Sequence, residues 1–180
     1  MENLKNKNIF IIIPSTALGD TLAWIPYIER FRIKNGCNIF CSTNYNNLFI
    51  KSYSKITFVQ QPCFIKNLYK KIEIGLFLNS KHQYQQIPLQ QVASDILDLT
   101  YKEIKSKIDA FSQERLTDGK YVCIASESTA KCKLWNNEKG WQSTVDYLIS
   151  LNYKVVSLSI NKQPLNNVIE ILNQPLENLV

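Results

Sequence analysis

The sequence lacks a long apolar run. Its strongest apolar stretch, residues 9–13, is far shorter than the roughly 18 residues that a membrane-spanning helix needs. Lysines precede it, as in a secretion signal, but Pro14 and a polar loop follow in place of a longer apolar stretch and a small-residue cleavage site. We therefore expect no membrane span and no secretion signal, and interpret the stretch as a buried first strand.

Paired cysteine motifs are also absent. The chain has five cysteines, an odd number at irregular spacing, and no two form a CxxC pair: Cys37, Cys41, Cys63, Cys123 and Cys132. This pattern favours neither a disulfide framework nor a zinc knuckle, and it fits a reducing compartment, the cytoplasm. The single histidine, His82, lies in a polar stretch, and we assign it no role.

A concentrated basic surface is missing as well. Lysine and arginine number 21 against 15 acidic residues, which gives a net charge of +6, but the lysines are scattered and form no arginine-rich stripe or basic helix. We therefore predict no nucleic-acid partner. The lysines either belong to a solvated basic surface or contact a phosphate-bearing small substrate.

What is present is an alternation of strand and helix patterns. Residues 8–13 (NIFIII) form a β-branched run typical of a strand buried on both faces of a parallel sheet. A turn over residues 14–19 leads to a helix that we expect to open at Asp20 and to stop at the left-handed pair Asn35–Gly36. Residues 38–42 then form a second strand, which implies a parallel crossover.

The pattern continues more weakly through the middle of the chain. We expect a short helix over residues 45–53, strands over 56–59 and 72–77, and a helix over 89–99. The charged segment 101–120 has no clear apolar face at its end, and we place a domain boundary there.

A second strand–loop–helix–strand unit follows. Residues 121–125 read as a strand, 126–140 as a polar loop, 141–151 as a helix and 154–160 as a strand, and we expect another helix over 166–172.

Two such units in tandem predict an α/β fold of the doubly wound, parallel-sheet class. The predicted domains cover residues 1–115 and 116–180, and the second is expected to be incomplete.

The first loop suited to chemistry is the one over residues 14–21 (PSTALGDT), because ligands of doubly wound sheets bind beyond the carboxyl ends of the strands. Gly19, with Leu18 beside it, would let the backbone turn tightly or approach a ligand. Asp20 is either a helix N-cap or a general base that takes a proton from an acceptor hydroxyl. The lone glycine matches neither the dinucleotide fingerprint nor the P-loop.

The second candidate loop follows the first strand of the second unit. Lys131 and Lys133 would neutralise a diphosphate, while Ser128 and Thr129 would donate hydrogen bonds to it. The alternative is a solvated loop in which the lysines occur by chance.

These two loops resemble a known family. Residues 14–31 (PSTALGDTLAWIPYIERF) resemble the leading strand–loop–helix of heptosyltransferases, glycosyltransferase family nine, and residues 128–148 (STAKCKLWNNEKGWQSTVDYL) resemble their second-domain loop. Further stretches resemble the autotransporter strand-loop-strand O-heptosyltransferase group in particular: residues 37–49 (CNIFCSTNYNNLF), 74–77 (IGLF), 88–108 (PLQQVASDILDLTYKEIKSKI) and 120–137 (KYVCIASESTAKCKLWNN).

The resemblance implies a GT-B-like fold and a definite reaction. Enzymes of this group transfer heptose from ADP-heptose to serine hydroxyls on the passenger of an autotransporter adhesin. Carried over to this sequence, Asp20 is the catalytic base and Lys133 the contact to the donor phosphates. The first domain would then face the acceptor, and the second would bind the nucleotide sugar.

The chain departs from the family in its length. Members carry a segment before the first strand and continue well past residue 180, and the part beyond it holds most of the ADP-binding surface and an iron-binding cysteine cluster. We therefore expect no cofactor in this chain, and expect an oligomer or a partner that supplies the missing half. Two alternatives stay open: a lipopolysaccharide-core heptosyltransferase, and a non-enzymatic truncated chain that pairs with a partner.

Overall fold

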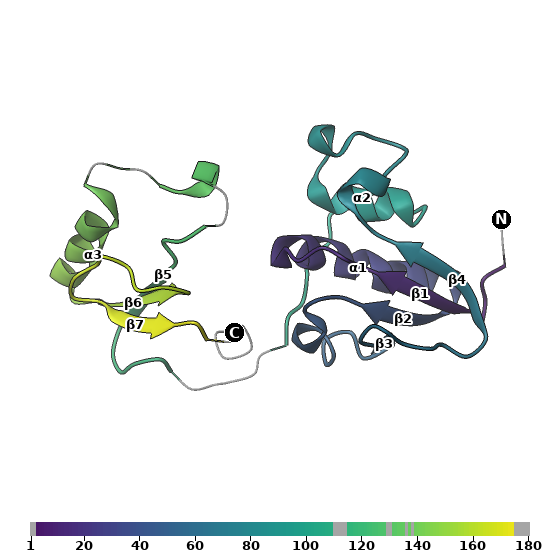
Figure 1. Cartoon of the computed structure of the whole chain (residues 1–180), viewed down its shortest axis with the longest axis horizontal. Coiled ribbons are helices and arrows are strands. Elements are labelled where there is room, and N and C mark those ends of the chain that lie inside the picture. Colours follow the sequence, from purple (N-terminus) through teal and green to yellow (C-terminus); the bar gives the residue numbers. More distant parts are fainter. Residues whose placement is uncertain (1–2, 110–114, 129–130, 136, 138, 175–180) are drawn as a thin grey trace. The chain divides into compact units, whose positions relative to one another are not determined.

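A computed structural model describes residues 3–109, 115–128, 131–135, 137 and 139–174. It divides into two compact units, residues 1–110 and 111–180, each with its own sheet (Figure 1). All strand pairs in both sheets are parallel, which confirms the predicted α/β class. In the described part of the chain, no helix combines the length and the apolar character that crossing a bilayer requires.

The sheet of unit 1 has β1 near its centre. The strands are β1 (Asn8–Ile12), β2 (Asn38–Ser42), β3 (Ile56–Phe58) and β4 (Leu68–Glu73), in the order β3-β2-β1-β4. Successive residues of β1 face opposite sides of the sheet. Ile9 and Ile11 are fully buried on one side, and Phe10 and Ile12 pack on the other against Ile65. Burial on both faces is the reason for the continuous apolar run.

Two helices of unit 1 pack against each other. These are α1 (Leu18–Asn35) and α2 (Leu89–Ile96), and the indole Nε1 of buried Trp24 donates to the carbonyl of Leu89 at 2.9 Å. Helix α1 begins at Leu18, ahead of the expected start at Asp20. It ends at Gly36, whose φ of 61° confirms the predicted left-handed stop.

Two predicted elements of unit 1 differ in the structure. The helix expected over residues 45–53 is only one 3₁₀ turn, Asn46–Leu48. The strand expected over 72–77 lies earlier, at β4, and the apolar residues after it form a second 3₁₀ turn, Leu76–Leu78. The physical reason is that β4 is an edge strand with exposed side chains, so its sequence (LYKKIE) has no apolar run to mark it.

The segment after α2 is tied to unit 1 although it forms no helix or strand. The carbonyls of Thr100 and Lys102 accept hydrogen bonds from Arg30 and Tyr27 of α1, at 2.7 and 2.8 Å. At its end, the buried carboxylate of Asp109 accepts hydrogen bonds from the backbone N–H groups of Lys51 and Ser52. This segment is therefore held by hydrogen bonds to groups distant in the sequence.

Unit 2 is a three-stranded sheet covered by one helix. Its elements are β5 (Tyr121–Ile124), α3 (Gly140–Ser150), β6 (Lys154–Ser159) and β7 (Ile169–Leu172), with the strands in the order β5-β6-β7. Its core is formed by Ile124, Val145 and Val155, from β5, α3 and β6.

The helix predicted over residues 166–172 is wrong, because β7 occupies most of that stretch. Ile169 and Ile171 stand opposite Val156 and Leu158 of β6 in a parallel pairing. The apolar spacing of the short sequence NVIEIL fits a strand as well as a helix turn. It forms a strand because β6 offers an edge whose backbone groups it can pair with.

Candidate functional site

Asp20 lies where β1 gives way to α1. Its carboxylate Oδ2 accepts a hydrogen bond from Ser15 Oγ at 2.5 Å, and the side chain is partly exposed. The N-cap of α1 is Ala17, which makes no side-chain cap bond, so the N-cap interpretation of Asp20 is wrong. Asp20 instead occupies the first helical turn, where the helix dipole favours a negative charge.

The loop that holds Asp20 is braced from the β2 side. Asn44 Nδ2 donates to the carbonyl of Ser15 at 2.9 Å, and the hydroxyl of Tyr45 donates to the carbonyl of Thr16. Ser15 Oγ in turn accepts the backbone N–H of Ala17 at 3.2 Å. The orientation of the Asp20 carboxylate is therefore fixed through Ser15 and the residues that follow β2.

Gly19 and Leu18 form the first two positions of α1 rather than a turn. A Cβ added at Gly19 would meet no described atom within 4 Å. The tight turn predicted at Gly19 is therefore wrong. The open space beside Gly19 does leave room for a ligand to approach the backbone, the other predicted use of this glycine.

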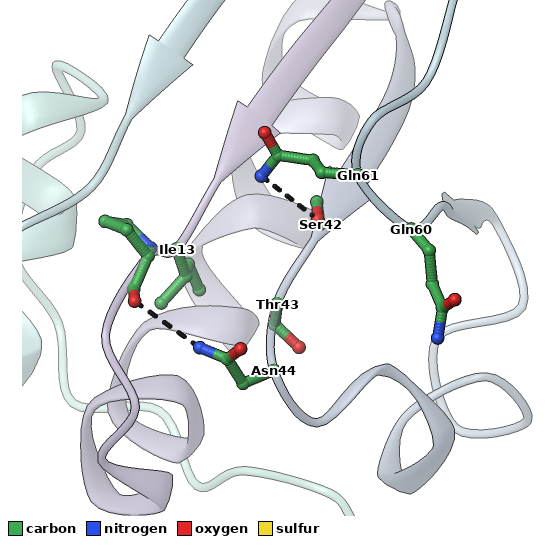
Figure 2. Close-up of a pocket in the computed structure, with 7 residues that line it drawn as sticks. Ile13, Ser42, Thr43, Asn44, Gln60 and Gln61 are labelled. Atoms are coloured by element: carbon green, nitrogen blue, oxygen red, sulfur yellow. Dashed lines mark hydrogen bonds between the residues drawn. The ribbon is translucent and has the colours of Figure 1, made fainter.

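A cavity of about 420 Å³ opens at the carboxyl ends of β1, β2 and β3 (Figure 2). It is lined only by uncharged residues: Ile13, Pro14, Ser42, Thr43, Asn44, Gln60 and Gln61. Figure 2 shows the amide of Gln61 reaching toward the hydroxyl of Ser42, a contact of 3.4 Å. The sequence did not predict this cavity, although polar residues directly after two predicted strands were the available signal.

The predicted phosphate-binding residues lie after β5 in unit 2. Lys131 and Lys133 begin and end an exposed 3₁₀ turn, and Ser128 is partly buried, while Thr129 lies outside the described residues. Neither lysine makes an ion pair with a described residue. Two ammonium groups therefore face solvent within one turn of chain.

The start of the same loop is fastened by Glu127, a role that the sequence did not reveal. Its Oε2 accepts the backbone N–H groups of Ile160 and Asn161, at 2.7 and 3.4 Å, just beyond β6. The bond from Ile160 is the main reason that the pKa of Glu127 lies below its usual value. The carboxylate thereby joins the carboxyl ends of β5 and β6.

A second cavity, of about 330 Å³, lies at the start of α3. Trp135 and Trp141 meet edge-to-face beside it with ring centroids 5.3 Å apart, and Lys139 is also in its wall. Lys131 and Lys133 do not line it. Asp20 belongs to unit 1 and both of these lysines to unit 2, so the structure places the predicted site residues on separate units.

The residues that the structure describes do not gather a metal site: no group of three or more His, Cys, Asp or Glu side chains lies together among them. Cys37 and Cys41 are buried in unit 1, where burial raises the pKa of both thiols, and Cys63, Cys123 and Cys132 are exposed. Within the described residues, these cysteines therefore form no cluster of metal ligands.

Comparison with curated proteins finds relatives of one kind. The autotransporter heptosyltransferase Aah of Escherichia coli is 36% identical over 88% of this chain, and the autotransporter heptosyltransferase TibC of Escherichia coli is 31% identical over 86%. BimC of Burkholderia thailandensis, named an inactive autotransporter heptosyltransferase, is 28% identical over 83%. The chain spans only 42%, 40% and 38% of these three proteins. No protein-family model matches the chain.

Solved structures give the same result for the fold. The crystal structure of TibC from enterotoxigenic E. coli, an iron-containing dodecameric glycosyltransferase, matches 99% of this chain with a TM-score of 0.86 at 26% identity. The structure of TibC in complex with ADP-D-beta-D-heptose matches with a TM-score of 0.87. The chain covers 51% of TibC in each case. The resemblance and the GT-B-like fold class expected from the sequence are thus confirmed.

Proposed function

We propose, from the premise that the homologues of this chain are autotransporter heptosyltransferases, that it forms part of a glycosyltransferase of the same activity. The enzyme would transfer heptose from ADP-heptose to a serine hydroxyl on an autotransporter passenger. Unit 1, within residues 1–115, would face the acceptor, and residues 116–180 would contribute to binding the nucleotide sugar.

Asp20 is the general base of the proposed reaction. The serine oxygen attacks the anomeric carbon of heptose and forms the new C–O bond, while its proton passes to the Asp20 carboxylate. The bond from the anomeric carbon to the diphosphate oxygen breaks, and ADP leaves with the electron pair. The hydrogen bond from Ser15 holds the carboxylate in one orientation, which keeps the base in place before the acceptor arrives.

Lys133 is the proposed contact to the donor phosphates, with Lys131, Ser128 and Thr129 as further donors. A leaving diphosphate gains negative charge in the transition state, and an ammonium group beside it stabilises that charge. The exposure of both lysines without an ion-pair partner among the described residues supports this role, since neither would have to break a salt bridge to bind phosphate.

The observation that carries the proposal is the carboxylate at the carboxyl end of β1. It is partly exposed, fixed by a neighbouring hydroxyl and placed at the sheet edge where ligands of α/β proteins bind.

The experiment is a transfer assay on the natural protein that carries this sequence, with ADP-heptose and the acceptor passenger. Asp20→Asn keeps an acceptor oxygen for Ser15 but removes the base, so transfer should fall by roughly a hundredfold to ten-thousandfold. Mass spectrometry of the acceptor would measure the added heptose. The NMR signal of the buried Trp24 indole N–H, in the same unit, would show that the fold is intact.

The matched control is Asp98→Asn, an exposed aspartate of unit 1 whose side chain, among the described residues, bonds only to Lys81. Its φ of 50° suits asparagine equally well. Transfer should be unchanged in this variant. An Asp20→Asn protein that transfers heptose as fast as the wild type would sink the proposed role of Asp20 as base.

Assembly and location belong to the same proposal. TibC is dodecameric, and we expect this protein to self-associate as well. All five cysteines are unpaired, which supports a reducing compartment, the cytoplasm, as the place of the reaction. TibC is also iron-containing, whereas the described residues here bring together no group of His, Cys, Asp or Glu side chains that could hold a metal ion.

A non-enzymatic role is the second candidate, and the likeness to BimC, a relative named inactive, favours it. The same assay separates the two functions. An absence of transfer by the wild-type protein, with donor and acceptor both present, would support the non-enzymatic role.

A further inference from the structure

The cavity at the carboxyl ends of β1, β2 and β3 is lined mainly by amide and hydroxyl side chains. Of its seven lining residues, three are primary amides and two are hydroxyls, and none is ionisable. Its volume of about 420 Å³ falls within the range of ordinary ligand sites. The lining therefore suits a polar, uncharged ligand.

Its frame is held by hydrogen bonds, so the cavity is built before a ligand arrives. The backbone N–H of Ile13 donates to the carbonyl of Ser42 at 2.9 Å, which joins the ends of β1 and β2. Asn46 Oδ1 accepts the N–H of Thr43 at 2.8 Å, and Asn46 Nδ2 donates to the carbonyl of Val59 at 2.9 Å. One asparagine thus fixes the residues after β2 against those after β3.

The amides that line the cavity keep bonding capacity to spare. The side chain of Gln60 makes no hydrogen bond with a described residue, and Gln61 makes only the 3.4 Å contact to Ser42. Asn44 uses its Nδ2 on the carbonyls of Pro14 and Ser15, which leaves its Oδ1 without a donor among the described residues. The amides of Gln60 and Gln61 each still offer a donor and an acceptor side by side, the complement of a peptide group, whereas Asn44 offers its acceptor oxygen.

The cavity adjoins the loop that carries the proposed base. Asn44 bonds the carbonyl of Ser15, and the hydroxyl of Ser15 bonds the carboxylate of Asp20. A ligand held by the three amides would therefore lie beside the residues that orient Asp20.

We infer that this cavity binds the acceptor polypeptide. The amides of the lining would bond to the backbone and side-chain amides of the acceptor that lie next to its modified serine. The inference rests on the proposed function and names the acceptor contacts of that site: Asn44, Gln60 and Gln61. An acceptor that carries phosphates or carboxylates is disfavoured, because the lining holds no cationic side chain to pair with its charge. The lining thus selects a polar, uncharged stretch of polypeptide over the anionic core of a lipopolysaccharide.

The test measures peptide binding directly, without transfer. A fluorescein-labelled, uncharged peptide of about ten residues, made of serine, asparagine and glycine, is titrated with the natural protein, and fluorescence anisotropy gives Kd. Because each variant loses at most two hydrogen bonds, Gln60→Ala and Gln61→Ala should each raise Kd by roughly fivefold, and the double variant by more than about tenfold. Gln85→Ala, an exposed glutamine outside the cavity, is the matched control and should leave Kd unchanged.

Two unlabelled competitors test the class of ligand. Inorganic phosphate and the neutral sugar maltotriose, each in large excess, should not displace the peptide from the cavity. Displacement by phosphate would overturn the inference in favour of an anionic acceptor, and displacement by maltotriose would overturn it in favour of a glycan acceptor. Unchanged Kd in the double glutamine variant would overturn it as well.

The failure of this inference can be distinguished from the failure of the proposed function. Peptide binding that depends on Gln60 and Gln61, in a protein that transfers no heptose, keeps the inference and removes the enzymatic role. The converse result is transfer that depends on Asp20 while neither Kd nor KM for the peptide changes when both glutamines are replaced. That result keeps the enzymatic role and removes the inference.

Discussion

At the scale of single residues, Asp109 holds the segment that leaves unit 1. Its two carboxylate oxygens accept the backbone N–H groups of Lys51 and Ser52 at 2.7 and 2.6 Å, and its own N–H donates to the carbonyl of Leu48 at 2.9 Å. The residue is only 4% exposed, so water cannot replace a lost bond easily. A carboxylate with two oxygens is needed here, because both neighbours are donors.

Asp109→Asn should therefore destabilise unit 1. The asparagine keeps one acceptor oxygen but turns an N–H₂ group toward the second donor, which costs about 1–3 kcal/mol of unfolding free energy. Loss of the Trp24 indole signal in a urea titration measures this quantity. Asp98→Asn, which alters only an exposed ion pair, is the control and should leave the midpoint close to that of the wild type.

The stability that Asp109 contributes should also depend on pH. Burial would raise the pKa of its carboxyl, but the hydrogen bonds from Ser52 and Lys51 outweigh burial and hold the pKa below the usual value. The contribution is therefore complete above the unfolded pKa of about 3.9 and is lost as the pH falls through the folded pKa. The wild type should lose stability toward acid faster than Asp109→Asn. Parallel curves of urea midpoint against pH would contradict this.

The place of a residue within a helix, strand or loop was easier to predict than the groups to which it forms hydrogen bonds. Asp20 was placed at the strand–helix junction from the sequence, because the apolar run before it and the helical spacing after it are local patterns. Its bond to Ser15 and the bracing of Ser15 by Asn44 were not predicted, since 29 residues separate the latter pair. Asp109 was missed for the same reason.

At the scale of elements, β7 shows how pairing overrides local spacing. Its residues are joined to β6 by a parallel ladder, which satisfies their backbone groups in the extended conformation. A short stretch of this kind has no conformation of its own, so the edge it meets decides its structure.

Substitutions at Ile171 should reveal the strand. In a strand, Ile171→Val should be more stable than Ile171→Ala by about 0.5–1 kcal/mol, because β-branched side chains suit a pleated surface. The same pair at Ile149, in α3, should give a smaller difference or the opposite order, since alanine has the higher helix propensity. Loss of the Trp141 indole signal in urea measures both pairs. An advantage of alanine at Ile171 would argue for a helix.

At the scale of the whole molecule, the two units differ in the size of their cores. Among described residues, unit 1 buries large side chains that include Trp24, Tyr27 and Phe49, whereas the buried apolar residues of unit 2 are Ile124, Val145, Val155 and Val156. The free energy gained from burial grows with the apolar area removed from water. Unit 2 should therefore be the less stable of the two.

Urea should unfold the two units in order. The Trp141 indole signal, which reports unit 2, should disappear at a lower urea concentration than that of Trp24, which reports unit 1. Asp109→Asn should lower the Trp24 midpoint and leave the Trp141 midpoint unchanged, since every bond of Asp109 to a described residue lies within unit 1. A single transition for both signals would mean that the units unfold together.

The sequence by itself determined the elements with continuous or periodic apolar patterns, β1, α1, β2, α3 and β6, and with them the parallel α/β class. These patterns are local consequences of burial, so they can be read without knowing the neighbours. Only the tertiary structure decided the edge strands β4 and β7, the anchoring of Asp109, and the cavity that gathers Asn44, Gln60 and Gln61. Each of these depends on hydrogen-bonding groups brought together from distant parts of the chain.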